Sequence, residues 1–281
     1  MDNLNKKDQV VLITGSSSGI GKELCRMLVS NGYKVFGSVR SKKDSVTLSK
    51  EFGSRFEPII MDVTIESQVL KARNKVEKYL GSAKLCALIN NAGVATLGPV
   101  EHMTTTEFVT QIDTKVLGTF LCTKTFLPLL GTNRKLEGPP GRIINISSIL
   151  GGKIGSPFMS AYCASKHAVE AFSESIRREL KPYGIKVIIV APGSISTPIW
   201  NTLKGHVGNM NFSDTEYHTP FNKVLKSLEK FDQNSLPIDK LSKVILKSIE
   251  TKDPEIRYTP TNDFSQKLWP YIPKKIMDKF F

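Results

Sequence analysis

The chain has 281 residues, and its 39 Lys and Arg against 26 Asp and Glu give a formal net charge of +13. A hydrophobic content of 40% is typical of a globular protein, and no apolar run reaches the roughly 18 residues that span a membrane. The basic surplus favours anionic partners such as phosphorylated cofactors or acidic lipid. Nucleic acid is not an expected partner, because no basic run is interleaved with aromatic residues.

The four cysteines, Cys25, Cys86, Cys122 and Cys163, lack the spacing of a metal site or a redox pair. They are expected to be free thiols in a reducing compartment, and no metal is predicted. The first residues lack the apolar core of a signal peptide, so the expected location is cytoplasmic.

Short apolar runs alternate with helical patterns along the chain. The runs expected to form strands are 9–14, 33–39, 56–61, 86–90, 142–147, 186–191 and 255–259. Helices are expected between them, over 20–31 and over the longer stretches 106–130 and 161–183. Strands separated by helices pair in parallel, so the pattern predicts one α/β domain over 1–281. Its doubly wound, mostly parallel seven-stranded sheet has helices on both faces and a ligand crevice at the carboxyl ends of the strands.

A glycine-rich turn connects the first predicted strand to the first helix. Glycines there let the backbone approach a pyrophosphate, and the helix N-terminus offers free N–H groups. The spacing G-x-x-x-G-x-G also fits an ordinary tight turn, but its strand–turn–helix context favours dinucleotide binding. The residues expected to contact the dinucleotide here are Thr14, Gly15, Ser17, Ser18, Gly19, Ile20 and Gly21.

The end of the second predicted strand discriminates between NAD and NADP. NAD is bound there by an acidic residue, but this chain has no carboxylate before Asp44. Arg40, with Ser41 beside it, offers donors to a 2′-phosphate, which favours NADP(H). A solvated basic turn is the alternative interpretation.

Two further turns follow predicted strands. Asp62 and Val63 end the third strand and are expected to contact the adenine through the Asp side chain and the Val backbone. Asn90, Ala92 and Gly93 belong to the sequence NNAG after the fourth strand, where the backbone would pass the adenosine ribose. A purely structural turn fits that segment equally well.

Tyr162 and Lys166 are four residues apart and therefore share one face of the predicted helix 161–183. An ammonium beside a phenol favours its ionised form, so Tyr162 is expected to exchange a proton near neutral pH. The same pair is common on solvated helix faces, so it indicates a catalytic role only together with the motifs around it.

The motifs together resemble those of the short-chain dehydrogenase/reductase superfamily in order and approximate spacing. They are Thr14-Gly-x-x-x-Gly-x-Gly21, Asn90-Asn-Ala-Gly93, Ser148, Tyr162-x-x-x-Lys166 and Pro192-Gly193. The resemblance runs from residue 9 to about residue 260. It implies a Rossmann-type fold, a nicotinamide cofactor and hydride transfer between a carbonyl and an alcohol.

The resemblance also implies roles for individual residues. Tyr162 would be the general acid for carbonyl reduction or the base for alcohol oxidation. Lys166 would lower the pKa of Tyr162 and bind the nicotinamide ribose. Ser148, or Ser147 in its place, would hydrogen-bond the substrate oxygen.

The segment after the sixth strand completes the implied cofactor site. Pro192 and Gly193 would turn the chain there, with Ile195 and Thr197 near the nicotinamide carboxamide. One position departs from the family, which usually has an Asn that holds a relay water where this chain has Lys115. A second ammonium would displace that water or push the pKa of the phenol further down, unless Lys115 points elsewhere.

The C-terminal third is expected to shape the substrate site. The stretch 199–234 is long and mixes aromatic with polar residues, among them Trp200, Met210, Phe212, Tyr217 and Phe221. These residues would line an apolar pocket under a lid or pack an extra helix. His206 and His218, in the same stretch, are expected at the surface.

The tail, about 260–281, carries apolar residues among lysines and is similar to tails of steroid- and retinol-dehydrogenase-like members. Packing over the pocket, a dimer contact and a weak membrane-surface contact are its three interpretations. Pro270 and Pro273 favour packing, because they leave room for only a short helix.

The sequence therefore predicts an NADP(H)-dependent oxidoreductase for a lipophilic carbonyl or alcohol of steroid, retinoid or fatty type. A catalytically weak NADP(H)-binding sensor or regulatory protein is the alternative, motivated by Lys115. The family resemblance further implies a homodimer or homotetramer.

Overall fold

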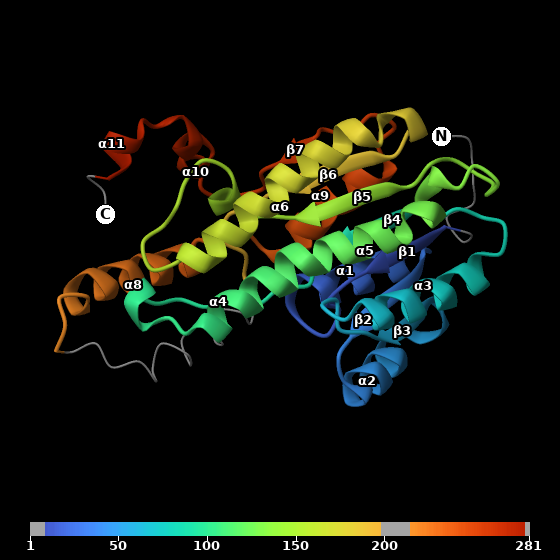
Figure 1. Cartoon of the computed structure of the whole chain (residues 1–281), viewed down its shortest axis with the longest axis horizontal. Helices are drawn as coiled ribbons and strands as arrows, with labels where there is room; N and C mark the ends of the chain where they lie inside the picture. The colour runs from blue at the N-terminus through green and yellow to red at the C-terminus, as the bar shows by residue number, and fades with distance from the viewer. Residues whose placement is uncertain (1–8, 198–213, 279–281) are drawn as a thin grey trace.

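The computed structural model describes residues 9–197 and 214–278, and its centre is a parallel sheet (Figure 1). The seven strands follow the order β3-β2-β1-β4-β5-β6-β7, and every neighbouring pair is parallel. The strands are β1 (Val10–Ile13), β2 (Lys34–Val39), β3 (Phe56–Ile60), β4 (Ala87–Asn90), β5 (Arg142–Ile146), β6 (Lys186–Val190) and β7 (Arg257–Tyr258). Each lies inside its predicted range, and the predicted fold class is confirmed.

Helices cover both faces of the sheet. One layer contains α1 (Gly19–Ser30), α2 (Lys42–Phe52) and α9 (Ile238–Glu250). The other contains α3 (Glu66–Leu80), α5 (Gly118–Leu127) and α6 (Ser160–Glu179). Figure 1 shows α5 and α6 lying across the near face of the sheet.

The strand residues divide between these layers by simple alternation. Val10 and Leu12 of β1 pack with α3, α5 and α6, whereas Val11 and Ile13 pack with α1, α2 and α9. Because both faces are buried, β1 is a continuous apolar run rather than an alternating one.

The single helix predicted over 106–130 is interrupted, and this is the main correction to the predicted elements. α4 (Thr105–Ile112) and α5 are joined by a π-helical turn, η4 (Asp113–Leu117). A second π turn, η5 (Pro128–Thr132), ends the segment and contains Gly131 at φ +136°. Where α5 begins, a Cβ on Gly118 would stand only 2.6 Å from Val63, so the helix is held close to the end of β3. π turns of this kind often occur at functional sites.

The remaining helical segments are short or lie at one end of the sheet. The 3-10 turns are η2 (Gly53–Arg55), η3 (Val100–His102), η6 (Ile149–Gly151), η7 (Lys181–Tyr183) and η8 (Trp269–Tyr271). Beyond the carboxyl ends of the strands lie α8 (His218–Gln233), α10 (Ser265–Leu268) and α11 (Lys274–Met277) (Figure 1).

All four cysteines are free thiols, as predicted. Within 9–197 and 214–278, no helix has the length and apolar character needed to cross a bilayer. The same two ranges contain no cluster of His, Cys, Asp and Glu suited to a metal ion.

Candidate active site

The glycine turn after β1 is tied to the end of β4 by a set of short hydrogen bonds. The Thr14 hydroxyl oxygen accepts from the backbone N–H groups of Asn91 and Ala92 at 2.9 and 3.0 Å. The Asn91 amide nitrogen donates to the Thr14 and Gly15 carbonyl oxygens, each at 2.9 Å. Sequence reasoning did not select Asn91, although it lies inside the NNAG motif that pointed to this turn.

The shape of this turn fits a pyrophosphate. A Cβ on Gly15 would stand 2.8 Å from the Ala92 Cα, and one on Gly21 would overlap the Gly15 carbonyl oxygen. Helix α1 begins after Ser18, whose side chain caps no N–H group, and its first turn has no acidic residue. The exposed N–H groups of that turn therefore remain available to an anion.

The residues predicted to contact the adenosine half of the cofactor differ in whether their side chains already have hydrogen-bond partners within the protein. Arg40 is exposed after β2, and within the described residues its guanidinium makes no hydrogen bond or ion pair. Ser41 already caps α2, accepting from the Asp44 N–H at 3.0 Å and donating to its carboxylate at 2.8 Å. One carboxylate oxygen of Asp62 accepts from the N–H and hydroxyl of Thr64. Arg40 is thus the group best placed for a 2′-phosphate.

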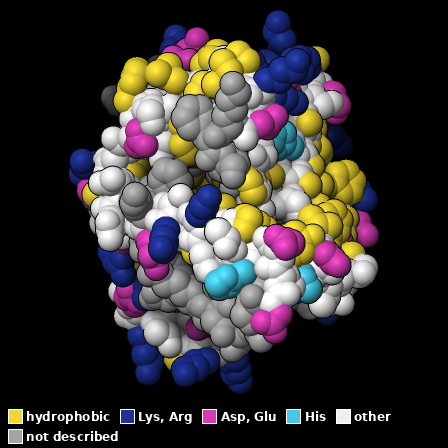
Figure 2. Space-filling model, turned by 90° about the vertical axis from the view of Figure 1, so that its left-hand side faces the viewer, with side chains coloured by type: hydrophobic (Ala, Val, Ile, Leu, Met, Phe, Trp, Pro, Cys, Tyr) yellow, Lys and Arg dark blue, Asp and Glu magenta, His cyan; other side chains and the backbone are white. Residues whose placement is uncertain are grey.

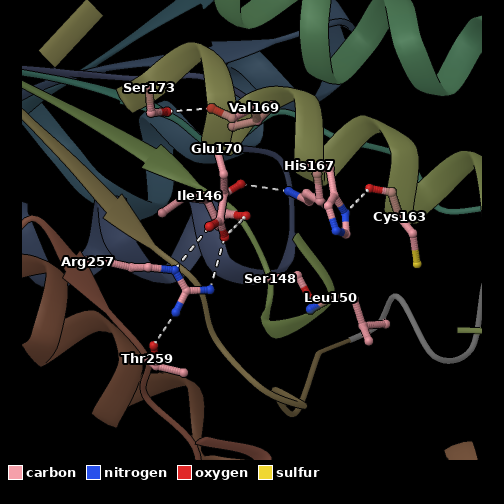
Figure 3. Close-up of polar contacts among 12 residues, drawn as sticks. Ile146, Ser148, Leu150, Cys163, His167, Val169, Glu170, Ser173, Arg257 and Thr259 are labelled. Carbon is pink, nitrogen blue, oxygen red and sulfur yellow. Dashed lines mark hydrogen bonds and ion pairs between the residues drawn. The ribbon is translucent and has the colours of Figure 1, made fainter. Parts of the chain in front are cut away.

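The Asn90 side chain points away from the glycine turn. It is buried and donates to the Asn145 amide oxygen at 2.8 Å. Asn145 donates to Ser173 at 2.8 Å. Ser173 in turn donates to the Val169 carbonyl oxygen at 2.6 Å (Figure 3). The polar side chains here therefore join the sheet to α6, and the turn depends on Asn91 instead.

The three residues predicted to be catalytic come together where β5 ends and α6 begins. Lys166 donates from Nζ to the Ile146 carbonyl oxygen at 2.6 Å, and Nζ lies 5.9 Å from the centroid of the Tyr162 ring. The Ser148 hydroxyl hydrogen-bonds Tyr162 and accepts from the Leu150 N–H at 3.2 Å. Both Ser148 and Tyr162 line the same cavity.

The phenol of Tyr162 does not have the depressed pKa that its neighbouring lysine suggested. Burial raises the pKa of Tyr162, and the hydrogen bond from Ser148 only partly opposes this rise. Burial also lowers the pKa of Lys166 to about 8, against the influence of the Glu170 carboxylate. Because the Lys166 ammonium is directed at a backbone carbonyl, desolvation dominates at the phenol. Tyr162 therefore holds its proton at neutral pH and is suited to donate it.

Lys115 turns into the site rather than out to solvent. Its side chain is buried on the π turn η4, and Nζ donates to the Gln111 side-chain oxygen at 2.5 Å. The same nitrogen lies 4.0 Å from the centroid of the Tyr162 ring. Burial, and then the charge of Lys166, hold the pKa of Lys115 well below its ordinary value. Two buried amines thus flank one phenol.

The segment after β6 closes the cofactor side of the site. The Pro192 carbonyl oxygen accepts from the Ile149 N–H, and the Gly193 N–H donates to the Pro260 carbonyl oxygen, each at 3.0 Å. Ile195 is buried against the core of the α1 layer. Thr197 lies beside Gly19, so this segment borders the glycine turn.

A cavity of about 400 Å³ opens from Ser148 and Tyr162 toward α8 and the C-terminal segment. Its apolar lining residues include Leu150, Met159, Val224, Leu228, Trp269 and Ile272. Its polar lining residues include Ser194, Lys223 and Gln266, none of which was selected from the sequence. The Ser194 hydroxyl is buried and has no hydrogen-bond partner within the described residues, so it is available to a ligand.

Part of the predicted substrate stretch lies outside the described residues, including Trp200, His206, Met210 and Phe212. The aromatic residues that are described have packing roles. Tyr217 donates its hydroxyl to Glu101 at 2.9 Å, and Phe221 is buried against Phe158. His218 is exposed at the start of α8, as predicted.

The chain matches a protein-family model and several characterised proteins. Residues 9–207 match the model described as short chain dehydrogenase. The chain is 34% identical over 272 residues to an NADPH-dependent 3-dehydrocapnine reductase of Ornithobacterium rhinotracheale, with 96% of this chain and 95% of that protein covered. It is 34% identical to a 3-ketodihydrosphingosine reductase of Bacteroides thetaiotaomicron, with 89% and 86% covered. It is 37% identical to retinol dehydrogenase 16 of Mus musculus, with 70% and 60% covered.

Solved structures show the same fold. A short-chain dehydrogenase from Streptomyces avermitilis matches with a TM-score of 0.78 at 25% identity, covering 97% of this chain and 93% of that chain. Serine dehydrogenase complexed with NADP+ matches with a TM-score of 0.75 at 22% identity, covering 90% and 94%.

We expect Lys115→Asn to change the pH dependence of turnover. In acid, protonation of Lys115 places a second positive charge beside Lys166, which penalises the site, and activity should fall along an acidic limb. The Asn variant cannot take up this proton and should lose that limb. The measurement is kcat/KM against pH for both proteins, and superimposable profiles would show that Lys115 takes no part.

Proposed function

The chain belongs to the short-chain dehydrogenase family of oxidoreductases, and we propose that it transfers hydride between NADP(H) and a lipophilic carbonyl or alcohol. The observation that carries this proposal is the Tyr162 phenol, which is buried beside the Ser148 hydroxyl at the head of a largely apolar cavity. The phenol, the hydroxyl and the cavity supply a proton donor, an oxygen-binding group and space for a substrate.

The proposed cofactor site consists of the glycine turn, the N-terminus of α1 and Arg40. NADPH bound there would supply the hydride. The turn and helix would hold the pyrophosphate, and Arg40 would pair with the 2′-phosphate. The similarity to the Ornithobacterium relative, an NADPH-dependent reductase, supports the same cofactor.

The chain's own groups would then handle the proton. Tyr162 would donate its proton to the substrate oxygen, and Ser148 would donate a hydrogen bond to the same oxygen as negative charge develops there. Lys166 would keep a positive charge close to the resulting phenolate and hold the end of β5 through the Ile146 carbonyl oxygen. The raised pKa of Tyr162 keeps the phenol protonated at neutral pH, which is the form that reduction requires.

The cavity and the relatives support a lipophilic substrate. Apolar side chains from η6, α8 and the C-terminal segment, with Met159 just before α6, surround the space beyond Tyr162, as in sites that take apolar ligands. The polar groups Ser194, Lys223 and Gln266 would orient a substrate that carries a polar end. The names of the relatives, two reductases and a retinol dehydrogenase, agree with a carbonyl or alcohol as the reacting group.

We expect Tyr162→Phe to lower NADPH-dependent turnover by about 10²- to 10⁴-fold, the usual contribution of a general acid. The substrates are ketones of increasing apolar chain length. Turnover is measured as the fall in NADPH absorbance. NADPH binding, measured by fluorescence, should remain. Tyr183→Phe, in η7, is the matched control and should keep full activity.

Tight NADPH binding with no turnover of any ketone by the unmodified protein would favour the sensor alternative. Full activity of Tyr162→Phe would contradict the proposed chemistry.

We expect Arg40→Ala to weaken NADPH binding by about 10- to 100-fold and to leave NADH binding unchanged, because charge-assisted hydrogen bonds to the 2′-phosphate are lost. Dissociation constants for both cofactors are the measurement. Lys50→Ala removes another exposed cation, at the far end of α2, and should change neither. Equal losses for the two cofactors would contradict a 2′-phosphate site.

We also propose a weak contact between the C-terminal segment and anionic membrane surfaces. Phe264, Leu268, Tyr271 and Ile276 are 69%, 50%, 78% and 47% exposed. Lys153 lies over the Tyr271 ring at 5.5 Å. Figure 2 shows hydrophobic side chains next to Lys or Arg side chains along the upper edge of this face, the edge where Figure 1 places α10 and α11. This combination suits a lipid surface beside the cavity.

We expect Leu268→Ser with Tyr271→Ser to lower vesicle binding at least about tenfold, since two apolar side chains no longer enter the lipid. Cosedimentation with phosphatidylglycerol–phosphatidylcholine vesicles is the measurement, and added salt should weaken binding. Val46→Ser with Leu70→Ser, each 48% exposed elsewhere, is the matched control. Equal binding of both double variants, or equal binding to pure phosphatidylcholine, would contradict this contact.

A further inference from the structure

Glu170 lies one turn beyond Lys166 on α6, and both of its carboxylate oxygens are engaged (Figure 3). Oε1 accepts from the Ser147 hydroxyl at 2.7 Å and from Arg257 Nη2 at 3.1 Å. Oε2 accepts from Arg257 Nε at 3.1 Å. Arg257 also donates from Nη1 to the Thr259 hydroxyl at 2.7 Å. One carboxylate therefore joins β5, α6 and β7.

The contact is enclosed and geometrically specific. The Glu170 side chain is 13% exposed and that of Arg257 is 29% exposed. The two-pronged pairing of a guanidinium with a carboxylate fixes the relative orientation of both planes. A Cβ on Gly151 would overlap the Ser147 hydroxyl and stand 3.0 Å from both the Glu170 Oε1 and the Lys166 Cβ. The turn η6 is thus packed directly onto this contact.

Two adjacent residues at the end of β5 are hydrogen-bonded to side chains on the same face of α6. Ile146 is held by Lys166 through its carbonyl oxygen, and Ser147 is held by Glu170 through its hydroxyl. The next residue is Ser148, whose hydroxyl meets Tyr162. A shift of the first two residues would move the third relative to Tyr162.

We propose that Glu170, held by Arg257, is a positioning residue that fixes Ser148 against Tyr162 and places a negative charge one helical turn from Lys166. The inference rests on the proposed oxidoreductase function. Glu170 does not touch the cavity and acts only through Ser147 and Lys166.

The charges around Lys166 make the proposed role of Glu170 visible in the pH at which Lys166 loses its proton. Glu170 on the same helix raises the pKa of Lys166, while burial lowers it to about 8. Lys115 faces it from η4, and Arg257 on β7 neutralises part of the Glu170 charge. Removing the negative charge should therefore make Lys166 lose its proton at lower pH. Removing the positive charge of Arg257 should have the opposite effect.

The test is kcat/KM against pH with NADPH and the most active ketone. Glu170→Gln should lower the maximum by up to about 100-fold, the cost of displacing a reacting group by roughly 1 Å. Its alkaline limb should move about one pH unit lower. Arg257→Gln should move that limb higher, and Glu170→Asp should recover part of the lost rate.

Glu174→Gln is the matched control, because Glu174 lies one turn further along α6 and pairs with Arg178 at 3.3 Å on the surface. Glu174→Gln should change neither the maximum kcat/KM nor the pH of its alkaline limb. If Glu170 had a purely structural role, Glu170→Gln and Arg257→Gln would both lower kcat/KM, but their alkaline limbs would not move in opposite directions. That result would overturn the proposal.

Circular dichroism and NADPH binding show whether Glu170→Gln folds. If it does not fold, Ser147→Ala tests the proposal in its place. It removes one hydroxyl and should lower kcat while leaving the alkaline limb in place. An unchanged kcat in Ser147→Ala would also overturn the proposal. If Tyr162→Phe is inactive while Glu170→Gln behaves like Glu174→Gln, the positioning role fails and the proposed function stands.

Discussion

Burial of the Tyr162 phenol is the constraint on which the candidate site depends. A phenolate is costly where water is excluded, so burial raises the pKa of Tyr162, and the Ser148 hydroxyl opposes this only in part. The same burial lowers the pKa of Lys166 to about 8. At neutral pH the site therefore holds a neutral phenol beside a lysine that keeps most of its charge. This state suits proton donation to a carbonyl oxygen.

The geometry that maintains this state comes from one stripe of one helix. Tyr162, Lys166 and Glu170 follow each other at intervals of four on α6, so they face the same way. They meet the end of β5, which offers a carbonyl oxygen and two successive hydroxyl groups. The parallel sheet places that end beside the glycine turn of β1 and the NNAG turn of β4, so the proton donor and the proposed dinucleotide crevice share one edge.

The family resemblance added Ser148 to the site, and periodicity and turn motifs were enough to predict the sheet, its helices and the shared helix face of Tyr162 and Lys166. They could not predict the π turn that aims Lys115 at the Tyr162 ring, because one extra residue in a helical turn leaves no local pattern. They did not single out the Asn91 side chain, since only the strand's pleat decides which side chain faces the glycine turn. The Glu170–Arg257 contact joins residues 87 positions apart and depends on β7 packing beside β6. The pKa of Tyr162 was misjudged because spacing reveals a neighbouring charge but not burial.

The most direct test of this account is the ionisation of Tyr162 itself. Ultraviolet difference spectra of the unmodified protein against Tyr162→Phe, recorded across a pH titration, isolate this one phenol. We expect its phenolate to appear only above the ordinary tyrosine pKa of about 10. A phenolate already present near neutral pH would contradict it.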